Sequence, residues 1–177
     1  MTNPMLPGGD AATFDDPLAM LAACHVRIRK QLATLARLER HLPEHGHDDD
    51  ARAAARAILR YFDTAAIHHH EDEEASLLPR LLARAPEARG LSERLLREHG
   101  ELADRWRRLR PLLSGIAAGR RAVLPPKLVH EIAAAYHAHI EIEESELIPL
   151  AQEVLSADEV ATIGREMAGR RGVAVAA

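Results

Sequence analysis

The sequence predicts an all-α protein, an up-down-up-down antiparallel four-helix bundle with a short extra C-terminal helix. Apolar residues make up 47% of the chain but only 3% are aromatic, and a core rich in Ala and Leu suits packed helices better than a β-sandwich. Apolar positions recur at helical spacing in four long stretches. Clusters of proline and glycine separate these stretches, and the short connections force neighbouring helices to run antiparallel. The same regular breaks argue against an extended coiled coil.

The first two helices are predicted from their caps and breaks. Asp16 offers an N-cap and Pro17 fits the first helical position. The apolar pattern then continues to residues 41–43, where we expect a proline to end the helix. A polar loop over residues 44–50 leads into the second helix, for which Asp50 is the expected N-cap.

The remaining elements follow the same logic. Ser92 is the expected N-cap of the third helix, and two prolines at 125–126 begin the fourth. Ser156 and Glu159 form a predicted capping box for a short fifth helix. We therefore divide the chain into a disordered leader over residues 1–14, a bundle over 15–155, and a short helix with a mobile tail over 156–177.

One pattern occurs twice, and it is the most specific feature of the chain. The first copy reads HHEDEEASLLP from His69 and the second reads HIEIEESELIP from His139, so both share His-x-x-x-Glu-Glu-x-x-Leu-x-Pro. Residues four apart lie on one face of a helix, and each His and its first Glu can therefore reach one metal ion together. Two such pairs would supply much of a two-metal site.

Each of the four predicted core-facing stripes is interrupted by a metal-competent side chain. In an antiparallel bundle, the rise per residue puts all of these groups roughly 10–20 Å from the same end. Carboxylates buried without a cation would each cost several kcal/mol, and no basic residue shares these positions. Hydrogen-bonded core histidines and protonated carboxylates are the competing interpretations. Metal binding explains the whole set, which comprises His25, His69, Glu73, His99, His139 and Glu143.

The other histidines are expected outside the centre. His70 and Glu74 repeat the spacing one residue later, but the alignment with the apolar stripe favours His69. Because successive helical residues differ by about 100°, His68 and His70 cannot both face the same centre. We expect His70 and Glu74 to be outer partners of the ligands or surface groups. Solvated or off-stripe positions are predicted for His41, His45, His47, His130 and His137, and a packing role for Cys24.

With these motifs, together with His25 in CHVRIRKQL and His99 in REHGEL, the chain resembles the hemerythrin family of the bacterial HHE cation-binding type over approximately residues 16–154. The resemblance implies a four-helix bundle around a non-haem centre of two bridged Fe ions, held by the same six residues. One position departs from the family. Classical oxygen-carrying hemerythrins have a further histidine ligand where this chain has Leu95, so one iron would need water, hydroxide or another side chain.

Several functions fit such a centre. Imidazole and carboxylate ligands suit iron and manganese, and zinc can substitute. Our first hypothesis is a di-iron protein that binds dioxygen or a related small ligand, such as peroxide or nitric oxide, for storage or sensing. The alternatives are a peroxidase- or catalase-like enzyme acting on hydrogen peroxide and an iron-responsive regulatory switch. A binding protein is favoured over an enzyme because the chain shows no nucleophile motif and no general-base set outside the ligands.

Charge and cysteine content bound the partners and the compartment. The net charge is −4 and the basic residues are dispersed among acidic ones, so we expect neither a nucleic-acid nor a membrane partner. A single cysteine rules out an intramolecular disulfide framework and favours a reducing compartment. No signal peptide or spanning apolar run is apparent. We therefore expect a cytoplasmic protein.

Overall fold

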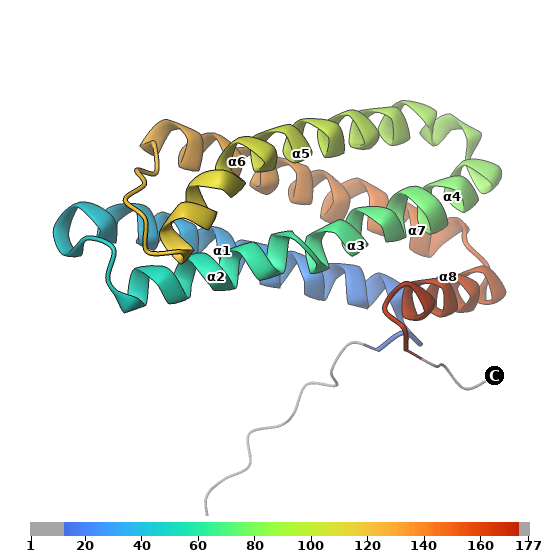
Figure 1. Ribbon diagram of the computed structural model, residues 1–177. Helices are drawn as coiled ribbons and strands as arrows, with labels where there is room; N and C mark the ends of the chain where they lie inside the picture. The colour runs from blue at the N-terminus through green and yellow to red at the C-terminus, as the bar shows by residue number, and fades with distance from the viewer. Residues whose placement is uncertain (1–12, 174–177) are drawn as a thin grey trace, which may run out of the picture.

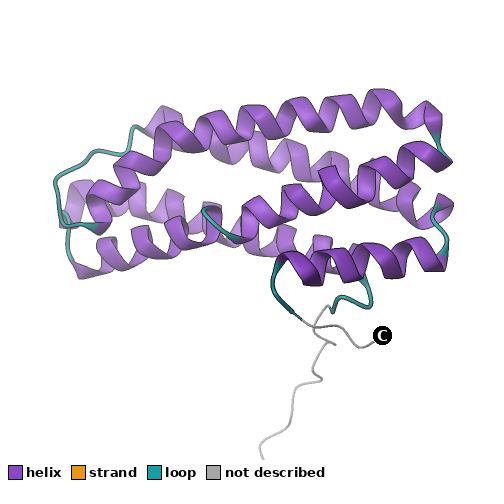
Figure 2. Cartoon of the chain, turned by 45° about the vertical axis from the view of Figure 1, so that its right-hand side comes forward, coloured by secondary structure: helices purple, strands orange, loops and turns teal. Residues whose placement is uncertain are grey.

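The computed structural model describes residues 13–173, and in this part of the chain every regular element is helical (Figure 2). The all-α prediction is confirmed. Most of the expected leader, residues 1–12, and the end of the expected tail, residues 174–177, lie outside the described residues. The elements are α1 (Pro17–His45), α2 (Asp49–Phe62), α3 (Ala65–Asp72), η1 (Glu73–Leu77), α4 (Leu78–Arg84), η2 (Pro86–Ala88), α5 (Arg89–Ala117), α6 (Pro126–Ile142), η3 (Glu143–Leu147), α7 (Ile148–Val154) and α8 (Ala157–Arg170).

Four long helical segments lie along a common axis (Figure 1). They are α1, the run from α2 to α4, α5, and the run from α6 to α7. Contacts close them into a ring, because α1 packs on α2, α2 on α5, α5 on α6, and α6 on α1. The short helix α8 lies outside this ring and contacts α1, α3 and η1. In residues 13–173, no helix is both long and apolar enough to cross a bilayer.

Several helix ends follow from their capping residues, and two differ from expectation. Asp16 accepts a hydrogen bond from the Ala19 amide, and the capping box of Ser156 and Glu159 is present, as predicted. The helix α1 does not end at Pro43 but continues to His45. A proline this close to the end removes only one internal hydrogen bond, and the Gly46 amide closes the last turn on Leu42.

The starts of α2 and α5 also correct the sequence prediction. The N-cap of α2 is Asp48, not Asp50, because the Asp48 carboxylate accepts the hydrogen bond from the Ala51 amide. Three consecutive aspartates made the choice ambiguous from sequence. Ser92 is not the cap of α5, which begins at Arg89 after the short η2 turn, and Ser92 is buried inside that helix.

Both copies of the repeated pattern contain a π-helical turn, which the sequence analysis did not predict. These turns are η1 and η3, and they begin at Glu73 and Glu143, the first residue of the Glu-Glu pair in each copy. In each, an amide bonds to a carbonyl five residues earlier, Leu78 to Glu73 and Ile148 to Glu143. The proline that follows cannot donate a hydrogen bond, and its ring would clash with the carbonyl four residues back in a regular α-helix. A wider turn relieves this conflict.

The apolar core consists of two clusters with a buried polar layer between them along the helices. One cluster includes Ile28, Leu102 and Ile140, and the other includes Leu21, Leu77 and Leu95. On α1, for example, His25 falls between Leu21 of one cluster and Ile28 of the other. The polar layer contains all six predicted metal ligands: His25, His69, Glu73, His99, His139 and Glu143.

Candidate metal centre

The six predicted ligands converge from four directions and are at most 4% exposed. They divide into two groups, in each of which one ligand atom per residue lies within 4.8 Å of the others. Both groups contain Glu73 and Glu143. The first adds His25 and His69 from α1 and α3, and the second adds His99 and His139 from α5 and α6. The arrangement therefore offers two neighbouring cation positions that share two carboxylates.

Glu143 lies at the middle of this arrangement. Its Oε2 is 3.0 Å from Nε2 of His25 and 3.8 Å from Nε2 of His69. Its Oε1 is 2.7 Å from Nε2 of His139 and 3.8 Å from Nε2 of His99. Each carboxylate oxygen thus faces one pair of histidines, which is the orientation that a bridging ligand requires.

Glu73 repeats this division less symmetrically. Its Oε1 lies 3.5 Å from Nε2 of His69, and its Oε2 lies 3.3 Å from Nε2 of His99. Glu73 therefore also directs one oxygen to each group, but it approaches one histidine per group where Glu143 approaches two. Of the two carboxylates, Glu143 has the larger share of the contacts.

Outer carboxylates orient three of the four histidines. Nδ1 of His99 lies 2.7 Å from Glu74, and Nδ1 of His25 lies 3.1 Å from Glu144. Glu74 and Glu144 are the second residues of the Glu-Glu pairs in the two copies. Each copy therefore supplies one inner carboxylate and one outer partner for a histidine on another helix. For Glu74, the structure selects the outer-partner alternative of the sequence analysis. Such partners fix the ring and leave Nε2 directed inward.

The fourth histidine, His69, lacks such a carboxylate. Its Nδ1 is buried without a hydrogen-bond partner among the described residues. Burial opposes protonation of His69, but the Glu73 carboxylate, the Cys24 thiol and Glu143 outweigh it and raise its pKa. In the other half of the centre, Glu98 accepts a hydrogen bond from Nδ1 of His139 at 2.8 Å. Cys24 and Glu98 each directly precede a predicted ligand, so they occupy comparable positions in the two halves.

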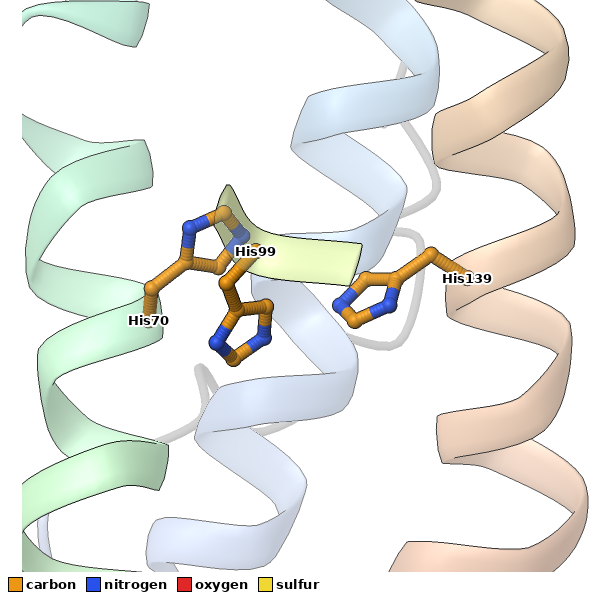
Figure 3. Close-up of side chains that lie close together, drawn as sticks. All are labelled: His70, His99 and His139. Atoms are coloured by element: carbon orange, nitrogen blue, oxygen red, sulfur yellow. The ribbon is translucent and has the colours of Figure 1, made fainter. Parts of the chain in front are cut away.

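His70 is the site residue that the sequence analysis placed elsewhere. Its ring stacks on His99 with centroids 4.0 Å apart, and it forms a third group with His99 and His139 whose ligand atoms all lie within 4.8 Å (Figure 3). The Nε2 atom of His70 is buried without a hydrogen-bond partner in residues 13–173. The structure therefore makes His70 a candidate ligand, where the sequence predicted an outer partner or a surface group.

The geometric reason is that the centre has two sides. Adjacent helical residues cannot face one ion, but His69 faces the His25 side while His70 faces the side of His99 and His139. A signal for this role was present in the sequence. Leu95 occupies the position of the missing family histidine, and the structure buries Leu95 in the apolar cluster. His70 supplies an imidazole to that same side.

The electrostatics suit a cation. Burial and the neighbouring His99 hold the pKa of His70 well below its usual value, so this imidazole keeps a free lone pair at neutral pH. Burial opposes protonation of His99, but the carboxylates of Glu143 and Glu73 outweigh it and raise its pKa to about 10. Burial and the charge of Glu143 raise the pKa of Glu73. Without a metal ion, protons must therefore balance the carboxylate charge.

The inward-facing atoms fit a metal better than they fit one another. Several lie close together, yet they lack hydrogen-bond partners in the described part of the chain, as expected where lone pairs are directed at the space between residues. Imidazole nitrogen with carboxylate oxygen is a donor set that suits iron, manganese or zinc. These unpartnered atoms include Nε2 of His25, His69, His70, His99 and His139, Oε2 of Glu73, and both carboxylate oxygens of Glu143.

Comparisons with known proteins agree with this donor set. Residues 16–151 match the family described as the hemerythrin HHE cation binding domain. A protein of Haemophilus influenzae, described as an uncharacterized protein, is 32% identical over 162 residues, which cover 92% of this chain and 94% of that relative. The matched family segment contains every residue of the centre.

Proposed function

Because the chain belongs to the hemerythrin HHE cation-binding family, we propose that it is a non-haem di-iron protein that binds dioxygen or a related small ligand, for storage or sensing, within an up-down-up-down four-helix bundle. One observation carries this proposal. Two groups of buried histidines share Glu73 and Glu143, and each carboxylate directs one oxygen to each group. A single-ion site has no need of such a division.

The residues divide between two ions in this proposal. His25 and His69 would hold one ion, His99, His139 and His70 would hold the other, and both would share the carboxylates of Glu73 and Glu143. His70 thereby replaces the ligand that is missing at Leu95. Manganese or zinc could occupy the same donors. Bound iron supplies one-electron redox chemistry and a coordination position that a small ligand can take.

The surroundings favour a small ligand. Apolar clusters on both sides of the polar layer exclude water from the centre. A hollow of about 170 Å³ reaches His70, which is smaller than the roughly 300–1,000 Å³ typical of sites for drug-sized molecules. Its walls are largely apolar and suit a diatomic molecule or peroxide better than a large organic substrate. They are formed by Phe62, Ala66, Ile67, His70, Ala103, Trp106 and Tyr136.

An iron-responsive switch is the second candidate, and the divided core supports it. Loss of metal would leave at least six buried ionisable side chains facing one another between two apolar clusters. Metal that binds the folded state stabilises it by mass action. A large loss of helicity on chelation would favour the switch, whereas unchanged helicity would favour the binding protein.

Iron content is the decisive measurement. We expect two irons per chain in protein from iron-supplemented cells, with visible absorption bands that change on reduction with dithionite and on oxygenation. Glu143→Ala, purified in the same way, should lack both irons. Zinc or no metal in the unmodified protein, with no spectral change after anaerobic iron reconstitution, would overturn the proposal. Hydrogen peroxide turnover that requires iron and is lost in Glu73→Ala would instead favour an enzyme.

A further inference from the structure

A second cluster of buried ionic groups lies outside the metal centre and joins α8 to the segment that carries His69 and Glu73. Asp72 directly precedes Glu73 and is fully buried. Its two carboxylate oxygens accept hydrogen bonds from Nη1 of Arg170 and from Nη2 of Arg171, each at 2.7 Å. Arg170 is the last residue of α8 and Arg171 is its C-cap. Charge-assisted bonds of this kind are the strong ones in proteins.

The same end of α8 also bonds to the π turn η1, which directly follows Asp72. The Ser76 hydroxyl lies in η1, is fully buried, donates to Glu166 and accepts a hydrogen bond from Arg170. One helical turn later, Arg80 donates to Glu166 at 2.7 Å. Polar side chains on the outer face of this segment are thus bonded to α8 before, within and after the turn that presents Glu73 to the metal.

We propose that α8 acts as a clamp, which means that its contacts hold the turn containing Glu73 in place for metal binding. Asp72 is the positioning residue for Glu73. Docking of α8 and binding of metal then favour each other. The inference rests on the proposed function, because it takes the centre to bind metal. Asp72 and Glu73 are neighbours on one backbone, so fixing the outer carboxylate restricts where the inner one can lie. Coupling between two binding events is reciprocal, and metal must therefore also favour the docked α8.

The helix that forms the clamp lies at the edge of the fold. The helix α8 is the last element of the described chain and lies outside the ring of long segments (Figure 1). Its inner face packs through Ile163 and Met167, while Gly164 lies against the segment before α1. A Cβ atom at Gly164 would lie 1.9 Å from the backbone oxygen of Phe14, so even alanine would displace α8 from its packed position.

The primary test is the rate of iron release. We expect Arg170→Gln/Arg171→Gln, loaded with iron(II), to release iron to a chromogenic chelator about tenfold faster than the unmodified protein, at the lower end of what residues supporting metal ligands contribute. Arg165→Gln is the matched control, because Arg165 is an exposed arginine of the same helix that bonds to Thr162 of α8 itself. It should release iron at the unmodified rate.

Hydrogen exchange tests the reciprocal half of the proposal. Amides of α8 in the unmodified protein should exchange more slowly with iron bound than after chelation, and the double variant should lose this difference. Gly164→Ala provides an independent disruption that keeps both arginines, and it should also speed release. Arg170→Lys/Arg171→Lys retains the charges without the guanidinium fork, and it should partly restore slow release. Circular dichroism verifies that each variant remains helical.

The outcomes separate the two proposals. If the unmodified protein binds two irons, but the double variant and Gly164→Ala match Arg165→Gln in release rate and α8 exchange, the clamp is wrong and the proposed function stands. If the unmodified protein binds no iron after reconstitution, the proposed function fails and the clamp fails with it. Faster release in both disruptions, with metal-dependent protection of α8, supports the clamp.

Discussion

Each copy of the repeated pattern presents one His and one Glu to the candidate metal centre, to which the first copy adds His70, but the two copies lie in different surroundings on their outer faces. In the first copy, Asp72 and Ser76 are buried and bonded to α8. The equivalent residues of the second copy are Ile142, which packs in an apolar cluster, and Glu146, which is exposed. Both copies nevertheless form a π turn over the same five positions.

This difference distinguishes the positions that the candidate metal site requires from the positions that can vary between the copies. The inner His and Glu and the following proline are the same in both copies, because they set the ligands and the wide turn. The outer residues touch no ligand and can therefore attach each turn to a different part of the fold. In this chain, one turn is fixed by ionic bonds to a terminal helix and the other by apolar packing.

The largest expected effect is on metal binding, when either inner glutamate is replaced with alanine. Glu143→Ala should abolish stoichiometric binding of both metal ions, because Glu143 approaches four histidines, whereas Glu73→Ala should retain partial binding, because Glu73 approaches two. Metal content per chain after reconstitution and gel filtration measures this. Helix content should stay largely intact in both. Equal losses in the two variants would contradict the unequal roles.

The two adjacent histidines should affect different ions. We expect His69→Leu to lower the affinity for the ion on the His25 side, and His70→Leu to lower the affinity for the ion on the His99 side. Each affinity should fall by at least about tenfold. Stepwise metal titration followed by calorimetry resolves the two binding events. The result would be contradicted if His70→Leu bound both ions as the unmodified protein does, since His70 would then be a packing residue.

The outer faces should differ in their contribution to stability. Asp72→Asn should lower the free energy of unfolding of the metal-free protein by about 2 kcal/mol, because it weakens charge-assisted bonds to two arginines. Glu146→Gln, at an exposed position of the other copy, should change it by less than about 0.5 kcal/mol. Urea unfolding curves provide both values. Comparable losses would show that burial by α8 does not distinguish the copies.

The smallest effect concerns the other end of α8. The Ser156 amide, Arg84 and the Ser156 hydroxyl hold the pKa of Glu159 at about 2. Because this pKa is lowered on folding, the bonds of the Glu159 carboxylate stabilise the protein at pH values above the ordinary glutamate pKa of about 4.3. This stabilisation is lost as the pH falls toward 2. Glu159→Gln should therefore reduce the difference in unfolding midpoint between pH 6 and pH 3. An unchanged pH dependence would show that the exposed ion pair contributes nothing measurable.

Spacing and capping rules predicted much of this structure from sequence. The caps at Asp16 and Ser156 follow from local hydrogen bonds, and the convergence of the six predicted ligands follows from helical periodicity in antiparallel segments. The π turns were not predictable in this way, because hydrophobic periodicity assumes a regular helix. The position of His70 was not predicted, because helical periodicity directs a stripe to a single point, whereas the candidate ligands form groups on two sides of the centre.

The contacts of α8 could not be predicted because they join residues far apart in sequence. Asp72 is 98 residues from Arg170, and no local rule links them. In the sequence, Asp72 is one of several acidic residues beside the motif, and nothing distinguishes it from exposed neighbours such as Glu71. Only the packing of α8 against α3 and η1 gives it a role.

The polar layer between the two apolar clusters has a consequence for how the molecule unfolds. The two apolar clusters are separated by a layer of buried ionisable side chains. Metal ions bound in this layer would link all four long segments at once. Calorimetry should therefore record a sharper unfolding transition, at a higher temperature, for the metal-loaded protein than for the protein after chelation.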